Sequence, residues 1–258
     1  MNNIIINGVL TEDKSINLDS GFFFGKGLFE TIYITNKAIF LEKHLNRLNM
    51  GLNTLNIKKK VYKDEVEKAI GILGCENKAL KIMVSEENTI ISMRHIGYTK
   101  GDYERGFALK ISGVKRNPYS NMTYLKSFNY YENIIEREKV VKEGYNEVMF
   151  FNVHNFLSEG SLSNIFFVKN KTIYTPAVKC GLLNGIVREI IIEKVKEDNI
   201  FDIKEGNFTF EDIVGSEGAF ITNSLLGVMK VNSIDGTKIK ESIITEYVHN
   251  LYESLIYR

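Results

Sequence analysis

The sequence predicts an α+β protein with two domains. Short apolar runs alternate with tight-turn residues, which indicates antiparallel strands, and segments with a one-sided apolar stripe indicate helices. Residues 115–123 (KRNPYSNMT) have no periodicity and indicate a linker. We therefore expect a small N-terminal α/β domain over residues 1–114 and a larger C-terminal domain over residues 124–258, because 258 residues suffice for two cores.

The N-terminal half shows clear local signals. Asn7-Gly8 between two apolar runs is typical of a type I′ hairpin turn. Leucines at three- and four-residue spacing predict a helix over 41–56, and Gly74 is expected to end a second helix over 63–73. The strands that we expect here cover residues 4–6, 9–10, 27–34, 38–41 (after a turn at 36–37), 79–84, 90–94 and 107–114.

The C-terminal half is predicted in the same way. The turn Asn170-Lys171 indicates a hairpin, and Thr209 is expected to cap a short helix that ends near Gly215. The helices expected here cover residues 124–142 (with Ile134, Ile135, Val140 and Val141 buried), a segment after Asn184-Gly185, and 241–257; the strands cover 148–151, 165–168, 172–174 and 219–221.

The composition excludes several classes of function. There are 33 basic and 32 acidic residues, so the net charge of +1 gives no electrostatic footprint for nucleic acid or a membrane surface. Cys75 and Cys180 form no CxxC pattern, and the four histidines lack metal-ligand spacing, so we expect neither a disulfide framework nor a metal site, with the histidines structural or on the surface and the cysteines in the core. No segment resembles a signal peptide or a membrane span, which favours a cytoplasmic location.

Four features stand out from this background. Glu159 lies among small residues before an apolar strand, where a buried carboxylate needs a charged partner. Lys126 is placed near a helix start, against the helix dipole, with Tyr130 four residues on. Arg47 lies beside a leucine stripe, and Asn184-Gly185 precedes a helix whose first amides can bind a phosphate. Each also has an ordinary interpretation, as a loop carboxylate, a surface cation or a plain helix start.

One cofactor accounts for all four features together. Pyridoxal phosphate needs a lysine to form a Schiff base with its aldehyde, an acid beside its ring nitrogen, and cationic and backbone donors for its phosphate.

The order of these segments resembles the class IV aminotransferase family. The segments are FGKGLFET, HLNRL, RNP followed by LKSFNYYENI, EGSLSNIFF, GLLNGIVRE and FITNSLLGVMKV, and together they cover nearly the whole chain. The resemblance implies the two-domain fold-type IV architecture, similar to D-amino-acid aminotransferase, with pyridoxal 5′-phosphate in the interdomain cleft. It also implies a homodimer that acts on a small-molecule amino substrate.

The resemblance also assigns roles to individual residues. Lys126 becomes the Schiff-base lysine and acid–base catalyst, and Glu159 the partner of the pyridinium nitrogen. Tyr130 is expected to reach the phenolic oxygen of the cofactor. The phosphate is expected to be bound by Arg47, the backbone amides of Ile186 and Val187, and the Ser224 hydroxyl.

Within the family, the segments are most similar to the aminodeoxychorismate lyase branch. That branch implies conversion of 4-amino-4-deoxychorismate to 4-aminobenzoate and pyruvate, with Thr31 assisting proton transfer. Lys26, Lys230 and Val187 depart from the residues common at these positions, and Arg94, His95 and Arg116 are candidates to bind a carboxylate. An aminotransferase for branched-chain or D-amino acids is the alternative, and a binding protein without the cofactor is a third hypothesis.

Overall fold

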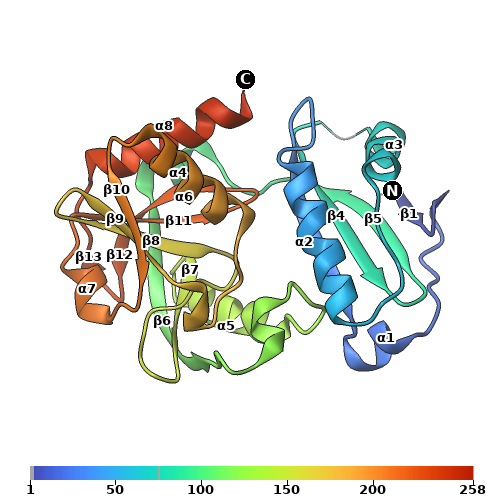
Figure 1. The fold of residues 1–258 in the computed structure, drawn as a ribbon, viewed down its shortest axis with the longest axis horizontal. Coiled ribbons are helices and arrows are strands. Elements are labelled where there is room, and N and C mark those ends of the chain that lie inside the picture. The colour runs from blue at the N-terminus through green and yellow to red at the C-terminus, as the bar shows by residue number, and fades with distance from the viewer. Residues whose placement is uncertain (1–2, 75, 258) are drawn as a thin grey trace. The chain divides into compact units, whose positions relative to one another are not determined.

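The structure is a computed structural model that describes residues 3–74 and 76–257, so Cys75 lies outside the described residues (Figure 1). The chain divides into two units, the first formed by Met1–Gly97 with Leu125–Tyr130 and the second by Tyr98–Tyr124 with Tyr131–Arg258. The strand expected over 107–114 on the N-terminal side of the linker lies in the second unit, because its backbone pairs with two strands there.

The first unit contains a five-stranded antiparallel sheet in the order β2-β1-β5-β4-β3. Its strands are β1 (Ile4–Ile6), β2 (Val9–Thr11), β3 (Gly27–Ile34), β4 (Lys78–Ser85) and β5 (Thr89–Arg94). Asn7 and Gly8 have φ values of 50° and 83°, so the predicted type I′ turn is confirmed.

Two amphipathic helices, α2 (Leu41–Thr54) and α3 (Lys63–Leu73), contribute to the core of this unit as predicted, with Gly74 ending α3 in the left-handed conformation. The strand expected over 38–41 is wrong: only a single bridge joins Ala38 to Ile34, and α2 begins at Leu41. Too few residues separate the turn at 36–37 from the start of α2 for a second strand to form a hydrogen-bonded ladder with β3.

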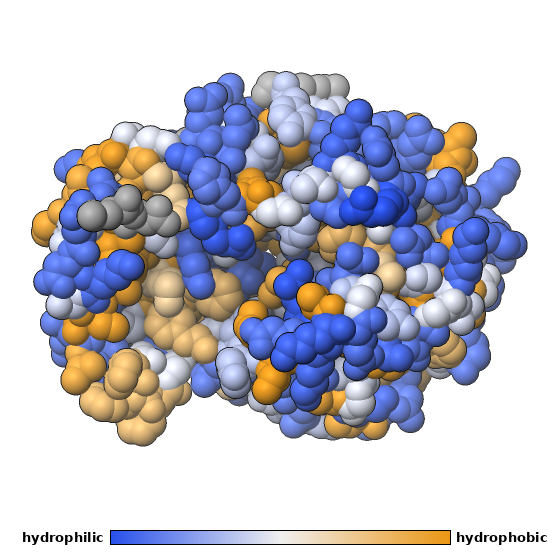
Figure 2. All heavy atoms as spheres, turned by 180° about the vertical axis from the view of Figure 1, so that it is seen from behind, coloured by the Kyte–Doolittle hydropathy of each residue, from blue (hydrophilic) through white to orange (hydrophobic). Residues whose placement is uncertain are grey.

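A short unpredicted helix, α1 (Ser20–Phe24), carries three exposed aromatic side chains. Phe22, Phe23 and Phe24 are 65%, 59% and 78% exposed. Figure 2 shows hydrophobic surface at the end of the first unit where Figure 1 places α1. A run of exposed aromatic side chains on a globular domain is typical of an interaction surface.

The helix predicted over 124–142 is wrong in its first part. A 3₁₀ turn at Asn121–Tyr124 is followed by an extended segment, and α5 covers only Tyr131–Lys142. The extended segment pairs with β3: Phe29 N donates to Lys126 O at 2.9 Å, and Phe128 N donates to Gly27 O at 2.9 Å. A Cβ on Gly27 would overlap the Phe128 ring, so the glycine makes room for this segment.

The second unit contains a mixed sheet in the order β10-β9-β8-β11-β12-β6-β7, with β13 paired to β12. The strands are β6 (Phe107–Arg116), β7 (Glu147–Asn152), β8 (Asn164–Lys169), β9 (Thr172–Pro176), β10 (Asp202–Gly206), β11 (Gly218–Asn223), β12 (Gly227–Ile234) and β13 (Thr237–Lys238). The hairpin of β8 and β9 confirms the prediction.

The helices of the second unit are α4 (Lys100–Arg105), α5, α6 (Ile186–Asp198), α7 (Phe210–Val214) and α8 (Ile243–Ile256), with a 3₁₀ turn at Val178–Cys180. Thr209 caps α7 and α8 closes the chain, as predicted. The buried positions expected on α5 are partly wrong, because Val140 is buried but Val141 is exposed, and Asn133 and Glu136 take its other inward positions. Cys180 is buried, as predicted.

Within the described residues, no helix is both long and apolar enough to cross a bilayer. The cytoplasmic location stays a prediction.

Candidate active site

Lys126 lies beside β3 because its backbone extends the sheet edge. Its Nζ lies 4.6 Å from the centroid of the Phe29 ring and 5.2 Å from that of Tyr130, and the two rings meet edge to face. Lys126 and Tyr130 are therefore close to each other, as predicted. They lie in an extended segment, however, and not on one face of a helix. The aromatic surfaces hold the ammonium group in place.

Thr31 lies on the same face of β3 as Phe29, since side chains alternate along a strand. Lys81 of β4 is its direct partner in the register, and Lys81 Nζ lies 4.9 Å from the Phe29 centroid. Burial, with a smaller contribution from Arg94, lowers the pKa of Lys81. This half-exposed face thus gathers two lysines and a hydroxyl around one ring.

Arg47 points from α2 toward the other face of β3, where Glu30 is only 1% exposed. Arg47 Nε and Nη2 donate to the two carboxylate oxygens of Glu30 at 2.7 and 2.8 Å, and His44 Nδ1 lies 2.7 Å from Glu30 Oε2. Burial alone would raise the pKa of Glu30, but Arg47 and His44 outweigh it and hold that pKa well below its usual range. The guanidinium is therefore oriented by a bidentate ion pair.

His44 is buried, and the prediction of a structural or surface role did not include this partner. Burial lowers its pKa, Glu30 opposes that effect, and the charges of Arg47 and Lys126 add to it. Glu30 and His44 are absent from the predicted site. Two sequence patterns could have identified them: side chains alternate along β3, which places Glu30 on the buried face, and His44 and Arg47 are three residues apart on a helix, which places them side by side.

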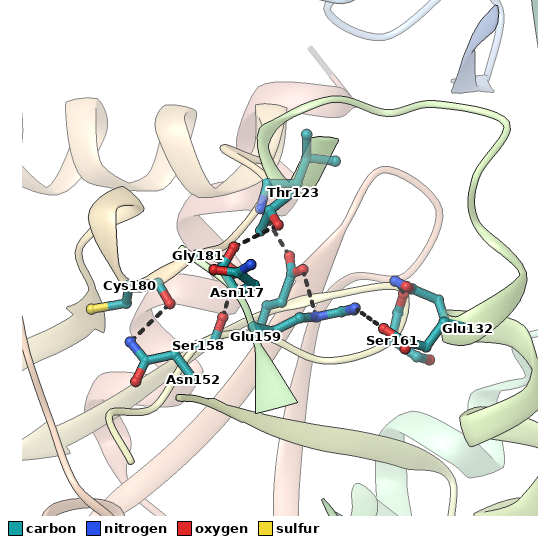
Figure 3. Close-up of polar contacts among 12 residues, drawn as sticks. Asn117, Thr123, Glu132, Asn152, Ser158, Glu159, Ser161, Cys180 and Gly181 are labelled. Atoms are coloured by element: carbon teal, nitrogen blue, oxygen red, sulfur yellow. Dashed lines mark hydrogen bonds and ion pairs between the residues drawn. The ribbon is translucent and has the colours of Figure 1, made fainter. Parts of the chain in front are cut away.

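In the second unit, Glu159 is 8% exposed and has specific partners (Figure 3). Leu183 N donates to Glu159 Oε2 at 3.0 Å, and Arg116 Nε lies 3.4 Å from Oε1. The same guanidinium lies 3.4 Å from Glu132 Oε2 and 3.9 Å from the centroid of the Phe150 ring. Arg116, a candidate carboxylate ligand from the sequence, thus provides the positive charge that a buried Glu159 requires.

The backbone around Glu159 explains why this carboxylate is fixed. Phe150 N donates to Glu159 O at 2.8 Å, and Leu157 N donates to Phe208 O at 2.7 Å just beyond β10. The segment therefore links both edges of the sheet.

The start of α6 has the features of a phosphate cradle. Its N-cap residue is Gly185, and no side chain caps the first amides, which include those of Ile186 and Val187. A Cβ on Gly185 would overlap Asn164 Oδ1. Asn164 is the register partner of Thr222, whose buried Oγ1 has no hydrogen-bond partner among the described residues. Ser224 follows one residue beyond the end of β11.

A family model described as "Amino-transferase class IV" matches residues 27–234, which include all of these groups. The chain belongs to the class IV aminotransferase family. The predicted family is therefore confirmed.

Relatives in this family carry different activities. Aminodeoxychorismate lyase of Bacillus subtilis is 27% identical, spanning 90% of this chain and 86% of its own. D-alanine aminotransferase of Staphylococcus aureus is also 27% identical, spanning 98% and 96%. The branched-chain amino acid aminotransferase of Escherichia coli has a solved structure with a TM-score of 0.89 at 21% identity over 98% and 94% of the two chains. This last likeness confirms the predicted fold-type IV architecture.

Membership of the family implies pyridoxal 5′-phosphate as the cofactor, as predicted. The residues present fit this group. The uncapped amides at Gly185, where no Cβ can be accommodated, and the unsatisfied Thr222 hydroxyl suit a phosphate. Lys126 Nζ lies over the rings of Phe29 and Tyr130, with the Thr31 hydroxyl on the same face of β3, and a lysine amine is the group that forms a Schiff base with the cofactor aldehyde.

Proposed function

We propose that this protein is a pyridoxal-phosphate-dependent aminodeoxychorismate lyase, which converts 4-amino-4-deoxychorismate to 4-aminobenzoate and pyruvate. The observation that carries the proposal is the face of β3 and β4 on which Thr31 lies directly opposite Lys81, beside the Phe29 ring that Lys126 also contacts. The substrate has two carboxylates, and Lys81 with the nearby charge of Arg94 provides cations for them.

In this proposal, Lys126 binds the cofactor covalently and Glu159 pairs with its ring nitrogen. Tyr130 binds the phenolic oxygen, and Arg47, the amides of Ile186 and Val187, and Ser224 bind the phosphate. Glu30 and His44 position Arg47, and Arg116 lies beside Glu159 as its positively charged partner. Pyridoxal phosphate, when bound, supplies the electron sink for the carbon that bears the substrate nitrogen.

The chain's own residues then move protons. The Lys126 amine takes the proton from the carbon that bears nitrogen, and the Thr31 hydroxyl assists this transfer. The carbon–oxygen bond to enolpyruvate breaks, the six-membered ring becomes aromatic, and the released enolpyruvate gains a proton to become pyruvate. Lys81 and Arg94 orient the two carboxylates throughout, which is a positioning role.

The alternative is an aminotransferase for branched-chain or D-amino acids, because the relatives include a D-alanine aminotransferase of the same identity. The two functions differ in their need for an acceptor. A lyase releases pyruvate from 4-amino-4-deoxychorismate with no keto acid present, whereas an aminotransferase acts on D-alanine or leucine only when 2-oxoglutarate is added.

The test is therefore a pair of assays on the holoenzyme, with Lys126→Ala as the background for both. Acceptor-free formation of 4-aminobenzoate and pyruvate in equal amounts supports the lyase. Amino-group transfer without acceptor-free release contradicts it and establishes the aminotransferase.

We also propose that the protein is a cytoplasmic homodimer. The exposed aromatic side chains of α1 support an interface, since burial between two copies would remove them from water.

A further inference from the structure

A cavity of about 1080 Å³ lies within the second unit, and none of the residues assigned to the cofactor lines it. It is formed by the end of α4, by β12 and β13, and by the start of α8. Its apolar lining residues include Val228 and Ile243, and none of Glu159, Ile186 or Ser224 lines it. The volume is typical of pockets that hold small organic ligands.

The rim of the cavity is predominantly basic. The charged lining residues are Arg105, Lys230, Lys238, Lys240, Glu241 and Glu246. Lys230 Nζ lies 2.6 Å from Glu241 Oε1, and Arg105 pairs with Asp102 at 2.7 Å. Lys238 and Lys240 form no ion pair within the part of the chain that the structure describes, although the charge of Lys238 helps to lower the pKa of Glu241.

A buried hydroxyl faces the same space. Thr245, in the first turn of α8, is 7% exposed, and its Oγ1 has no hydrogen-bond partner among residues 3–74 and 76–257. Gly218 packs closely against it, because a Cβ there would lie 3.1 Å from this oxygen and 2.5 Å from Ser242 Cβ. A buried hydroxyl without a partner is unfavourable, so an oxygen from a ligand would satisfy it.

The dipole of α8 favours an anion at the start of this helix. The 14 residues of α8 place the positive end of its dipole at Ser242, whose hydroxyl accepts from Ile244 N at 3.3 Å. The hydroxyl of Thr245, the helix end and the two lysines all line one cavity beside an apolar wall.

We propose that this cavity is a second binding site, which takes a small organic oxyanion. The anionic group, a carboxylate or a phosphate, lies at the start of α8 between the Thr245 hydroxyl and the ammonium groups of Lys238 and Lys240. The apolar body of the ligand packs against Val228 and Ile243. The site is independent of the proposed lyase activity, since it shares no residue with it.

The experiment is calorimetric titration of the holoenzyme, saturated with pyridoxal phosphate, with benzoate and with phenyl phosphate. We expect at least one of the two to bind, and the comparison identifies the preferred anion. Benzyl alcohol, which has the same ring without the charge, is expected not to bind. Absence of binding by both anions overturns the proposal.

Three variants locate the binding. Lys238→Glu with Lys240→Glu is expected to weaken it at least tenfold, and Thr245→Val several-fold, whereas Thr245→Ser keeps the hydroxyl and the affinity. Lys14→Glu with Lys58→Glu makes the same change of net charge on exposed residues of the first unit and is expected to leave affinity unchanged. Equal affinity in the wild type and the Lys238/Lys240 variant places the anion elsewhere and contradicts the proposal. Bound cofactor, measured by absorbance, verifies that each variant is folded.

Discussion

Arg47 and Glu30 form a bidentate ion pair at 2.7 and 2.8 Å, with the carboxylate buried between a strand and a helix. The pair fixes the guanidinium to the core of the first unit, and His44 occupies the remaining side of the same carboxylate. The phosphate ligand proposed for this enzyme is thus held by residues that need not touch the cofactor.

Replacement of Glu30 tests this relationship. Glu30→Gln keeps the shape but leaves Arg47 without a countercharge, so we expect a loss of about 3 kcal/mol in the free energy of unfolding, as for other broken buried pairs. Pyridoxal phosphate should also bind more weakly. Denaturant unfolding and cofactor titration measure the two effects.

The matched control is Glu42→Gln, which removes an exposed carboxylate of α2 that pairs with Lys63. Such surface pairs contribute little, so both measurements should stay at their wild-type values. Equal effects from the two variants would mean that the Glu30 pair has no special role.

Acid should destabilise the first unit through His44. Burial lowers the pKa of His44 below its ordinary value of about 6.5, so the unfolded chain binds a proton there more readily than the folded chain does. The free energy of unfolding therefore falls as the pH drops below about 6.5. The low pKa of Glu30 adds a further loss at more acidic pH, where that carboxylate becomes protonated.

His44→Gln should reduce the slope of unfolding free energy against pH between about 6.5 and 5, because the titrating group is gone. His95→Gln changes an exposed histidine and should leave the slope intact. Denaturant titrations at several pH values give the slopes. A slope in His44→Gln that equals the wild type would show that His44 does not cause the acid sensitivity.

The proposed role of the start of α6 in phosphate binding can be tested by replacing Gly185 with alanine. Gly185→Ala places a Cβ against Asn164 Oδ1, so the cradle must shift, and we expect the affinity for pyridoxal phosphate to fall at least tenfold. Gly71→Ala, in α3, adds the same group where nothing lies within 4 Å, and should not weaken cofactor binding. Fluorescence titration of the apoprotein gives both constants, and an unchanged value in Gly185→Ala would remove this helix start from the phosphate site.

The aromatic surface of α1 bears on the oligomeric state. Phe22→Ser with Phe24→Ser removes two exposed rings, so we expect the proposed dimer to dissociate at protein concentrations where the wild type is dimeric. Analytical ultracentrifugation measures the mass. Ile72→Ser, which removes a 45% exposed side chain on α3, is the control and should leave the dimer intact. A variant that stays dimeric places the interface elsewhere.

Local signals in the sequence predicted much of the fold. The Asn7-Gly8 turn, the leucine stripe of α2 and the end of α3 at Gly74 each depend on neighbouring residues, and each is confirmed. The family and its cofactor followed from the order of short segments. Elements such as α1 and β10 were missed because they are short and carry no periodic signal.

Long-range pairing accounts for what the sequence could not give. Lys126 lies in an extended segment and not in a helix, because its backbone bonds to Phe29 of β3 almost a hundred residues earlier. The partners of Arg47 and Glu159 were hidden for the same reason, since Glu30 and Arg116 approach them only in the folded sheets. Residue types suggested the chemistry, while the strand register decided which groups meet.

The most direct test of the central claim is to find the lysine that holds the cofactor. Lys126 and Lys81 lie over the same ring, at 4.6 and 4.9 Å from the Phe29 centroid, so proximity alone does not distinguish them. Borohydride reduction of the holoenzyme, followed by peptide mass spectrometry, fixes the cofactor where it is bound. We expect the label on Lys126, and its loss in Lys126→Ala but not in Lys81→Met. A label on Lys81, or on neither lysine, would contradict the account.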